Sequence, residues 1–403
     1  MSIDDQFVCA ECFDDIGIRQ FIKDNAVSTD CSFCDKQYED RSAISIDKLT
    51  EYIGDRLYEE YDMVENWLGR IDGEWVGKYW DTWDLLDKIG LDLPNQGSDQ
   101  LLQELIHRLP DHLWCERDPY GLNDVQVAQF SWSRFCHVIQ HERRFFFSSH
   151  TDGSEEADQT LLPGQVLERI FNYAEQVGLV RSLEVGTNLY RARYQHSGQN
   201  LQTAQDLGPP PIELAKQSNR MSPAGIVMFY GSDNPETALR ETANSSGTYV
   251  VGRFVTHRHA TVLDLAGLPD IPSLFEVPPE SLEYKPRRVL RFLHHISEEI
   301  SKPIKRDDRM HISYAPTQVV TEYIRSRLTQ NGTPLDGIVF SSAVHGGHVS
   351  YVLFATRNDV FEEPIRDTEN DPWIQLIDRS THLCTQEKID AWRHDSMVQE
   401  ELE

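Results

Sequence analysis

The chain has 403 residues, 39% of them hydrophobic, so it is long enough for two or three globular domains. Its formal net charge of −28 disfavours bulk electrostatic binding to nucleic acid or to an anionic membrane. The sequence contains no apolar run of 18 residues and no basic, apolar leader, so we expect a cytoplasmic protein that does not span a membrane.

Two Cys-x2-Cys pairs mark the first 45 residues as a metal-binding module. Cys9 and Cys12 form the first pair, and Cys31 and Cys34 form the second pair after 18 intervening residues. Four thiolates at this spacing are typical of a zinc ribbon, whose closed site leaves no coordination position for water. We therefore expect a structural zinc ion at residues 1–45. A disulfide pair is the alternative, and a reducing compartment disfavours it.

Residues 46–147 are predicted to form a helical domain. Apolar residues recur there at helical spacing in three stretches, which we interpret as core-facing stripes. The stripes comprise Leu49, Tyr52, Ile53, Leu57 and Tyr61, then Leu101, Leu102, Leu105 and Ile106, and then Phe135, Val138 and Ile139.

An acidic segment of small polar residues follows, and we interpret residues 148–162 as a linker. Beyond it, residues 163–363 mix strands with helices, which favours an α+β domain. We expect helices at 165–178, 288–299 and 317–328, and strands at 248–257, 260–266, 337–341 and 348–356. Residues 364–403 are predicted to be an acidic C-terminal tail, in which an apolar patch around Trp373 folds back or contacts a partner.

A turn followed by an apolar strand places Arg220 beside the core of this domain. Pro223 and Gly225 predict the turn, and residues 226–230 carry no charge, as expected of a buried strand. The strand ends at Tyr230, which is either a cleft residue or a core aromatic residue.

A short helix is predicted directly after this strand. Asn234 can cap it and Pro235 suits its first position, which places Glu241 about two turns into the helix. Glu241 shares a face with the small residues Thr237 and Ala238, which can approach a sheet closely. From spacing alone, an ordinary exposed glutamate stays the alternative.

Four motifs resemble, in order and spacing, the RES domain, a family named for its Arg, Glu and Ser residues. The motifs are LYRAR at 189–193, NRMSPAGIVMFYGSDNPETALRE at 219–241, YAPTQVVTEYIR at 314–325 and DGIVFSSAVHGGHVSYVLF at 336–354. This family is similar in fold to ADP-ribosyltransferases and comprises NAD-degrading toxins, some of them glycohydrolases and some phosphorylases. The resemblance implies an α+β chain in which an N-terminal zinc ribbon and helical domain precede an ADP-ribosyltransferase-like RES domain.

The resemblance also implies roles for single residues. Arg191 matches the Arg of the first motif, Glu241 the Glu and Ser342 the Ser. Arg220 and Tyr230 match the Arg and the aromatic position of the second motif. Because an arginine fork binds phosphate oxygens, both arginines are expected to hold the pyrophosphate of the substrate NAD.

Cleavage of the nicotinamide–ribose bond passes through an oxocarbenium-like state, which a nearby carboxylate stabilises. Glu241 is the candidate for this role. Tyr230 offers a stacking face or a hydroxyl, Ser342 a hydrogen bond to the ribose, and His345 a further ligand contact.

The sequence departs from the family pattern in one motif and leaves one choice open in another. The usual Gly-Arg-Trp-Asn opening is Asn-Arg-Met-Ser here, at residues 219–222, so an aromatic wall is missing. Ser341 and Ser342 are adjacent and alternate across a strand, so only one can face the cleft, and we favour Ser342.

The helical region resembles the HEPN-like regions that precede RES domains, and Arg134 with His141 is similar to the Arg-x4-6-His element of HEPN ribonucleases. Three functions follow: an NAD-degrading toxin or anti-phage effector, a HEPN-type ribonuclease, or a non-catalytic zinc-ribbon adaptor that binds NAD or ADP-ribose. We expect the first, in a homo-oligomer that an antitoxin or another regulatory protein restrains. Water, phosphate or a protein can each be the ADP-ribosyl acceptor.

Overall fold

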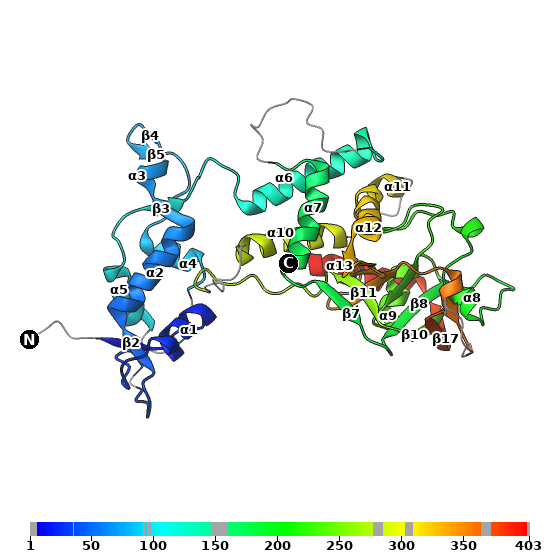
Figure 1. Cartoon of the computed structure of the whole chain (residues 1–403), viewed down its shortest axis with the longest axis horizontal. Helices are drawn as coiled ribbons and strands as arrows, with labels where there is room; N and C mark the ends of the chain where they lie inside the picture. Colours follow the sequence, from blue (N-terminus) through cyan, green and yellow to red (C-terminus); the bar gives the residue numbers. More distant parts are fainter. Residues whose placement is uncertain are drawn as a thin grey trace, which may run out of the picture. The chain divides into compact units, whose positions relative to one another are not determined.

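The computed structural model describes residues 6–34, 36–91, 93–94, 98–146, 160–276, 285–302, 309–363 and 372–400 (Figure 1). The chain forms two compact units, each built from separate stretches of sequence. The first unit comprises 1–126 and 270–289, and the second comprises 127–269 and 290–403. Most of the predicted linker at 148–162 lies outside the described residues.

The first unit combines short antiparallel strand pairs with helices. Its paired strands are β1 (Phe7–Cys9) with β2 (Ala43–Ser45), β3 (Tyr61–Met63) with β6 (Trp114–Glu116), and β4 (Arg70–Ile71) with β5 (Glu74–Trp75). Its helices are α1 (Ile16–Asp24), α2 (Ile46–Glu60), α3 (Val64–Trp67), α4 (Thr82–Lys88) and α5 (Ser98–Arg108), with a 3-10 turn at Ala10–Cys12.

One hydrophobic core joins the predicted zinc ribbon to the predicted helical domain. Leu49, Ile53 and Leu57 are fully buried on α2, as the helical spacing predicted, and they share a core with Val8 and Phe13 of the ribbon. Burial of such side chains contributes roughly 1.5–3 kcal/mol each. The predicted zinc ribbon and residues 46–126 of the predicted helical domain therefore belong to one unit, whereas residues 127–147 belong to the second unit.

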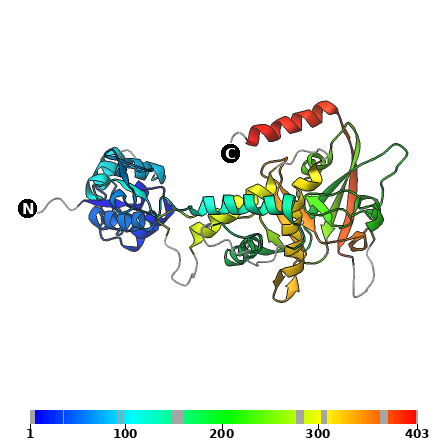
Figure 2. The same ribbon diagram turned by 90° about the horizontal axis from the view of Figure 1, so that it is seen from above.

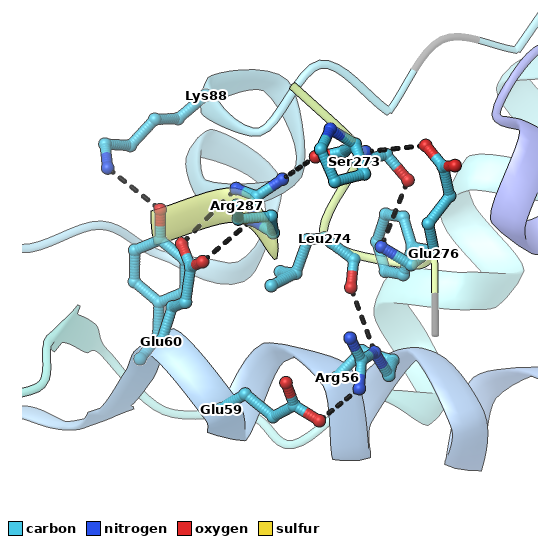
Figure 3. A network of polar contacts seen from close by, with 11 residues as sticks. Arg56, Glu59, Glu60, Lys88, Ser273, Leu274, Glu276 and Arg287 are labelled. Atoms are coloured by element: carbon cyan, nitrogen blue, oxygen red, sulfur yellow. Dashed lines mark hydrogen bonds and ion pairs between the residues drawn. The ribbon is translucent and has the colours of Figure 1, made fainter. Parts of the chain in front are cut away.

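Residues 270–276, which we call the strap, complete this core although they follow the strand β11 of the other unit in sequence. Leu274 and Phe275 are buried in the core of the first unit. Arg56 Nε of α2 donates to the Leu274 carbonyl at 2.9 Å (Figure 3). Tyr52 donates to the Phe275 carbonyl. The chain leaves the unit again through Arg287, which lies 2.9 Å from Glu60.

A nine-stranded sheet forms the centre of the second unit, in the order β16-β17-β10-β8-β9-β15-β14-β11-β7. The strands are β7 (Val180–Leu183), β8 (Asn188–Tyr194), β9 (Phe229–Ser232), β10 (Gly247–Thr256), β11 (Ala260–Asp264), β14 (Gly337–Ser341), β15 (Val349–Leu353), β16 (Val360–Phe361) and β17 (Ile374–Cys384). Neighbouring strands are antiparallel except for the pairs β11–β14 and β16–β17. A separate small hairpin consists of β12 (Thr329–Gln330) and β13 (Thr333–Pro334).

Helices of the second unit lie before, between and after these strands. They are α6 (Asp124–His137) with a π-helical continuation at Val138–Glu142, α7 (Pro163–Gln176), α8 (Ala204–Leu207), α9 (Pro235–Thr242), α10 (Pro286–Ser301), α11 (Met310–Ser313), α12 (Ala315–Arg327) and α13 (Gln386–Glu400). Of these, α6 and α10 begin in the first unit. Two 3-10 turns lie at Ile212–Leu214 and Arg357–Asp359. The mixed α+β fold is confirmed, and the predicted strands and helices lie within a few residues of their expected positions.

The two faces of the sheet belong to different hydrophobic cores. Phe229, Phe254 and Val339 lie in the core of one face. Ala192 and Val251 point to the opposite face, where they pack against α9 and α13. Because side chains alternate along a strand, the face of any strand residue follows from its register.

The C-terminal residues differ from the expected acidic tail. The apolar patch near Trp373 begins β17, which pairs along its whole length with β10 inside the sheet. Figure 2 shows α13 (red) running on directly from this strand, and Trp392 of α13 is buried against α9. Residues 374–384 are thus part of the fold of the second unit. Among the helices of the described residues, none is long and apolar enough to cross a membrane.

Candidate active site

The helix α9 begins as its sequence predicts and carries Glu241 near its end. The side chain of Asn234 accepts a hydrogen bond from Glu236 N at 2.8 Å, and Pro235 takes the first helical position. Ala238 and Leu239 pack into the core beneath the sheet. Burial of these two side chains fixes the rotation of α9, a helix of only 8 residues, about its own axis. The direction in which the Glu241 side chain points is thereby fixed as well.

The carboxylate of Glu241 contacts two buried serines of the sheet. Its Oε1 accepts a hydrogen bond from Ser342 Oγ at 2.8 Å and one from Ser350 Oγ at 3.3 Å. Ser342 follows β14 directly, whereas its neighbour Ser341 is exposed. The alternation of a strand thus directs Ser342 toward Glu241, as we expected when choosing between the two serines.

Tyr230 lies on the same face of the sheet as these serines. It pairs with Val352 of β15, and two residues further Ser232 pairs with Ser350, so all four side chains point to one side. The phenol of Tyr230 lies 2.9 Å from Ser222 Oγ. Burial raises the pKa of Tyr230 to about 12, so its hydroxyl stays protonated and can donate a hydrogen bond at neutral pH.

Two histidines of the β14–β15 loop lie against the same side of α9. His345 Nδ1 is 2.7 Å from Thr237 Oγ1, and His348 Nδ1 is 3.1 Å from Asp233 Oδ2. The two imidazole rings lie 4.2 Å apart. Of these residues, sequence reasoning named only His345 as a ligand contact. Polar residues recur at 233, 237 and 241, one helical turn apart, and this spacing is the signal that would have identified Asp233 and Thr237.

Arg191 is placed on the opposite face of the sheet. Its neighbour Tyr190 pairs with Ser232, so alternation turns Arg191 away from the Glu241 side. Its guanidinium donates to the carbonyls of Leu207, at 3.0 Å, and of Tyr230, at 2.7 Å. Burial lowers the pKa of Arg191 to about 9, so it stays a cation at neutral pH. The expected pairing of Arg191 with Glu241 in one cleft does not occur in this structure.

Arg220 lies in the loop that holds the phenol of Tyr230. Its side chain donates to the Ile300 carbonyl in the last turn of α10, and its own carbonyl accepts from Thr317 at the start of α12. Two residues further, Ser222 contacts the Tyr230 hydroxyl. A short loop therefore links Arg220 to the face of the sheet that presents Tyr230. Arg191 lies on the opposite face.

A cavity of about 240 Å³ lies on the face opposite Glu241, between β7, β11, β14 and β15. Arg181, Asp264 and Tyr351 line it, together with apolar side chains. Arg181 is already paired with Asp264 at 3.3 Å. Because none of the predicted catalytic groups lines this cavity, we place the candidate active site on the polar face beneath α9.

The four cysteines of the first unit form a compact cluster. Their sulfur atoms all lie within 4.8 Å of one another, and the closest pairs are 3.6–3.8 Å apart. A tetrahedral zinc ion with Zn–S bonds of about 2.3 Å requires sulfur–sulfur distances of about 3.8 Å, far longer than the roughly 2.05 Å of a disulfide. Cys9, Cys12, Cys31 and Cys34 thus have the geometry of a four-thiolate metal site and are not disulfide-bonded.

Arg134 and His141 lie on α6 and its π-helical continuation. Arg134 donates to Thr160 Oγ1 at 3.2 Å, and the ring of His141 lies 5.3 Å from that of His137. Both side chains are exposed. These contacts do not assemble Arg134 and His141 into a common site.

These observations define an α+β protein with a carboxylate–serine cluster beside a short helix and a separate group of four cysteines that has the spacing of a metal site. Residues 188–374 match the family model of the RES domain, and residues 24–153 match that of the HEPN/RES N-terminal domain 1. The chain accordingly contains a RES domain preceded by a HEPN/RES N-terminal domain. No curated protein and no solved structure matches it significantly.

Proposed function

We propose that the second unit cleaves the nicotinamide–ribose bond of NAD, with Glu241 stabilising the positive charge that develops on the ribose. The observation that carries this proposal is the Glu241 carboxylate, held by Ser342 and Ser350 on the face that also presents Tyr230. The match to the RES domain agrees with it, since this family is consistent with NAD-related toxins.

The surroundings of Glu241 suit the reaction because they fix the carboxylate before substrate arrives. Hydrogen bonds from Ser342 and Ser350 restrict one oxygen, Oε1, to a single orientation. Such a preorganised negative group stabilises an oxocarbenium-like state without the cost of reorienting during the reaction. As the C–N bond breaks, its electron pair neutralises the pyridinium nitrogen of the departing nicotinamide.

Binding of NAD is assigned to groups on the same side of the sheet. The protonated Tyr230 phenol can donate to ribose, and its ring offers a face for nicotinamide. Arg220 is the candidate partner of the pyrophosphate, because its guanidinium fork matches phosphate oxygens. Arg191 instead supports the site from behind, through the carbonyl of Tyr230.

We assign zinc to the four-cysteine site, because a closed set of four thiolates in tetrahedral spacing is the usual structural zinc site. The ion would be held by Cys9, Cys12, Cys31 and Cys34 and would take no part in NAD cleavage. An NAD-depleting toxin also requires restraint in its own cell, so we propose an antitoxin or another regulatory protein as partner.

The test is nicotinamide release from NAD by the purified protein and by two glutamine variants. In Glu241→Gln, the side chain keeps its size but loses its charge, so kcat should fall by roughly 10²–10³-fold while NAD affinity changes little. Absence of nicotinamide release by the wild-type protein would refute the proposed function.

Glu236→Gln is the matched control on the same helix. Glu236 is half exposed and accepts from Arg240 at 2.8 Å and from Trp392 at 3.1 Å, on the side of α13. Loss of its ion pair should cost about 0.3–0.5 kcal/mol of stability and leave kcat near that of wild type. Equal losses of kcat in the two variants would show that the catalytic carboxylate is misassigned.

A further inference from the structure

Three residues of the α9 segment, each one turn apart, hold the loop between β14 and β15. The contacts are Asp233 with His348 at 3.1 Å, Thr237 with His345 at 2.7 Å, and Glu241 with Ser342 at 2.8 Å. Residues four apart on a helix have Cβ atoms about 6 Å apart. The imidazole of His345 therefore lies about one helical turn from the Glu241 carboxylate, beside the proposed site of bond cleavage.

Carboxylates outnumber cations on the α9 segment that lies beside His345. Asp233, Glu236 and Glu241 belong to the α9 segment, whose one cation, Arg240, already binds Glu236 at 2.8 Å and Asp395 at 3.5 Å. A phosphate dianion approaching here would be repelled by the carboxylates and would find the arginine engaged. A neutral nucleophile, water, meets no such barrier.

His345 is kept in its neutral form. Burial lowers the pKa of its imidazole, and the positive charge of Arg240 and the neighbouring His348 lower it further, against the opposing effect of Glu236 and Asp233. Nδ1 of His345 lies 2.7 Å from Thr237 Oγ1, and in the tautomer whose Nδ1–H donates to this hydroxyl, Nε2 carries the lone pair.

His348 has a different environment, because it is the partner of Asp233. The Oδ2 atom of Asp233 contacts His348, while its Oδ1 is buried with no hydrogen-bond partner among the described residues. The rings of His345 and His348 lie 4.2 Å apart, so positive charge on His348 disfavours a proton on His345.

We propose that water is the ADP-ribosyl acceptor and that Nε2 of His345 accepts its proton as general base. The inference rests on the proposed NAD cleavage and specifies its second substrate. The water oxygen forms a bond to the ribose C1′ as the bond to nicotinamide breaks, with the electron pair leaving on the pyridine nitrogen. The proton of the water passes to His345 and then to solvent, so the products are ADP-ribose, nicotinamide and a proton. His348 is a positioning residue that holds His345 neutral.

The experiment follows NAD cleavage over a range of pH, with and without inorganic phosphate, and identifies the ribosyl product. We expect ADP-ribose under both conditions and a rate that falls only below the ordinary imidazole pKa of about 6.5. His345→Ala should lower kcat by roughly 10²–10⁴-fold and abolish this pH dependence, and added imidazole should restore part of the rate. His348→Asn should move the acid limb to higher pH, because His345 then gains a proton more easily.

The outcomes separate the two claims. A phosphorylated ribosyl product, or a His345→Ala variant that is folded and keeps its kcat, would overturn the inference while leaving NAD cleavage in place. No consumption of NAD by the wild-type protein would refute the proposed function itself. Thermal unfolding of each variant reports whether it is folded, and rescue by imidazole distinguishes a lost proton acceptor from a distorted loop.

Discussion

At the scale of single residues, two arginines that the sequence motifs treat alike have different surroundings. Arg191 donates to two backbone carbonyls, those of Leu207 and Tyr230, and lies on the sheet face opposite Glu241. Arg220 is placed by the loop that also contacts the Tyr230 phenol. Arginine at the first position is thus suited to support the fold, and arginine at the second to bind an anionic substrate.

Replacement of each arginine should have a different effect. Arg220→Ala should raise the KM for NAD by one to two orders of magnitude, since a charge-assisted hydrogen bond is worth about 1.5–3 kcal/mol. Arg191→Ala removes the hydrogen bonds to the Leu207 and Tyr230 carbonyls and leaves Leu207 O with Arg193 Nε, which should lower the free energy of unfolding by about 1–3 kcal/mol. Steady-state kinetics and thermal unfolding of both variants measure the contrast. A stable Arg191→Ala protein with the larger rise in KM would reverse the assignment.

At the scale of elements, the features that the sequence predicted well are those that form locally. The cap of α9 needs only Asn234 and Pro235, and each cysteine knuckle closes within four residues. By contrast, β17 is predicted poorly. Its residues are polar at many positions, and the pairing partner that makes them a strand lies in β10, more than 100 residues earlier.

The metal site can be tested by replacing one ligand. The wild-type protein should contain about one zinc ion per chain, and Cys31→Ser should lose it. Because a structural zinc contributes on the order of 10 kcal/mol to folding, this variant should unfold in the first unit. Cys136→Ser is the control, since Cys136 lies outside the four-cysteine cluster and should keep the metal. Elemental analysis and thermal unfolding provide the measurement, and a folded, metal-free wild-type protein would contradict the assignment.

At the scale of the whole molecule, the first unit is incomplete without the strap. Leu274 and Phe275 fill its core although the strand β11 that precedes them in sequence belongs to the second unit. Gly17 of α1 lets the strap backbone come close, since a Cβ at that position would lie 2.3 Å from the Phe275 carbonyl group. Deletion of the strap would therefore disrupt the first unit, although residues 1–126 of that unit are distant from the strap in sequence.

Two glycine substitutions test this close approach. Gly17→Ala should force the strap away and destabilise the protein by about 1–3 kcal/mol through overpacking. Gly54→Ala on α2 is the matched control, because its Cβ would meet the nearest atom, of Leu109, at an ordinary 3.7 Å. The control should be neutral or more stable by up to about 1 kcal/mol, from helix propensity. Hydrogen exchange of the strap amides and thermal unfolding measure both. If the strap amides of Gly17→Ala exchanged hydrogen as slowly as those of the wild-type protein, the contact between α1 and the strap would not be tight.

The sequence by itself predicted the four-cysteine cluster and the capped helix that carries Glu241, and it favoured Ser342, the serine that contacts Glu241 in the structure. Each of these depends on local spacing, because a knuckle, a helix cap and the alternation of a strand involve residues close in the chain. The sequence also predicted the α+β class and most strand positions from apolar runs that any sheet must bury.

Only the tertiary structure decided which local features meet. Alternation says that Arg191 and Tyr190 point to opposite faces, but the pairing of Tyr190 with Ser232 was needed to show which face holds Glu241. The contact of Asp233 with His348 and the insertion of the strap into the first unit likewise join residues more than 100 positions apart. Such contacts follow from strand register and core packing, which are settled by the burial of the whole chain and leave no signal in local spacing.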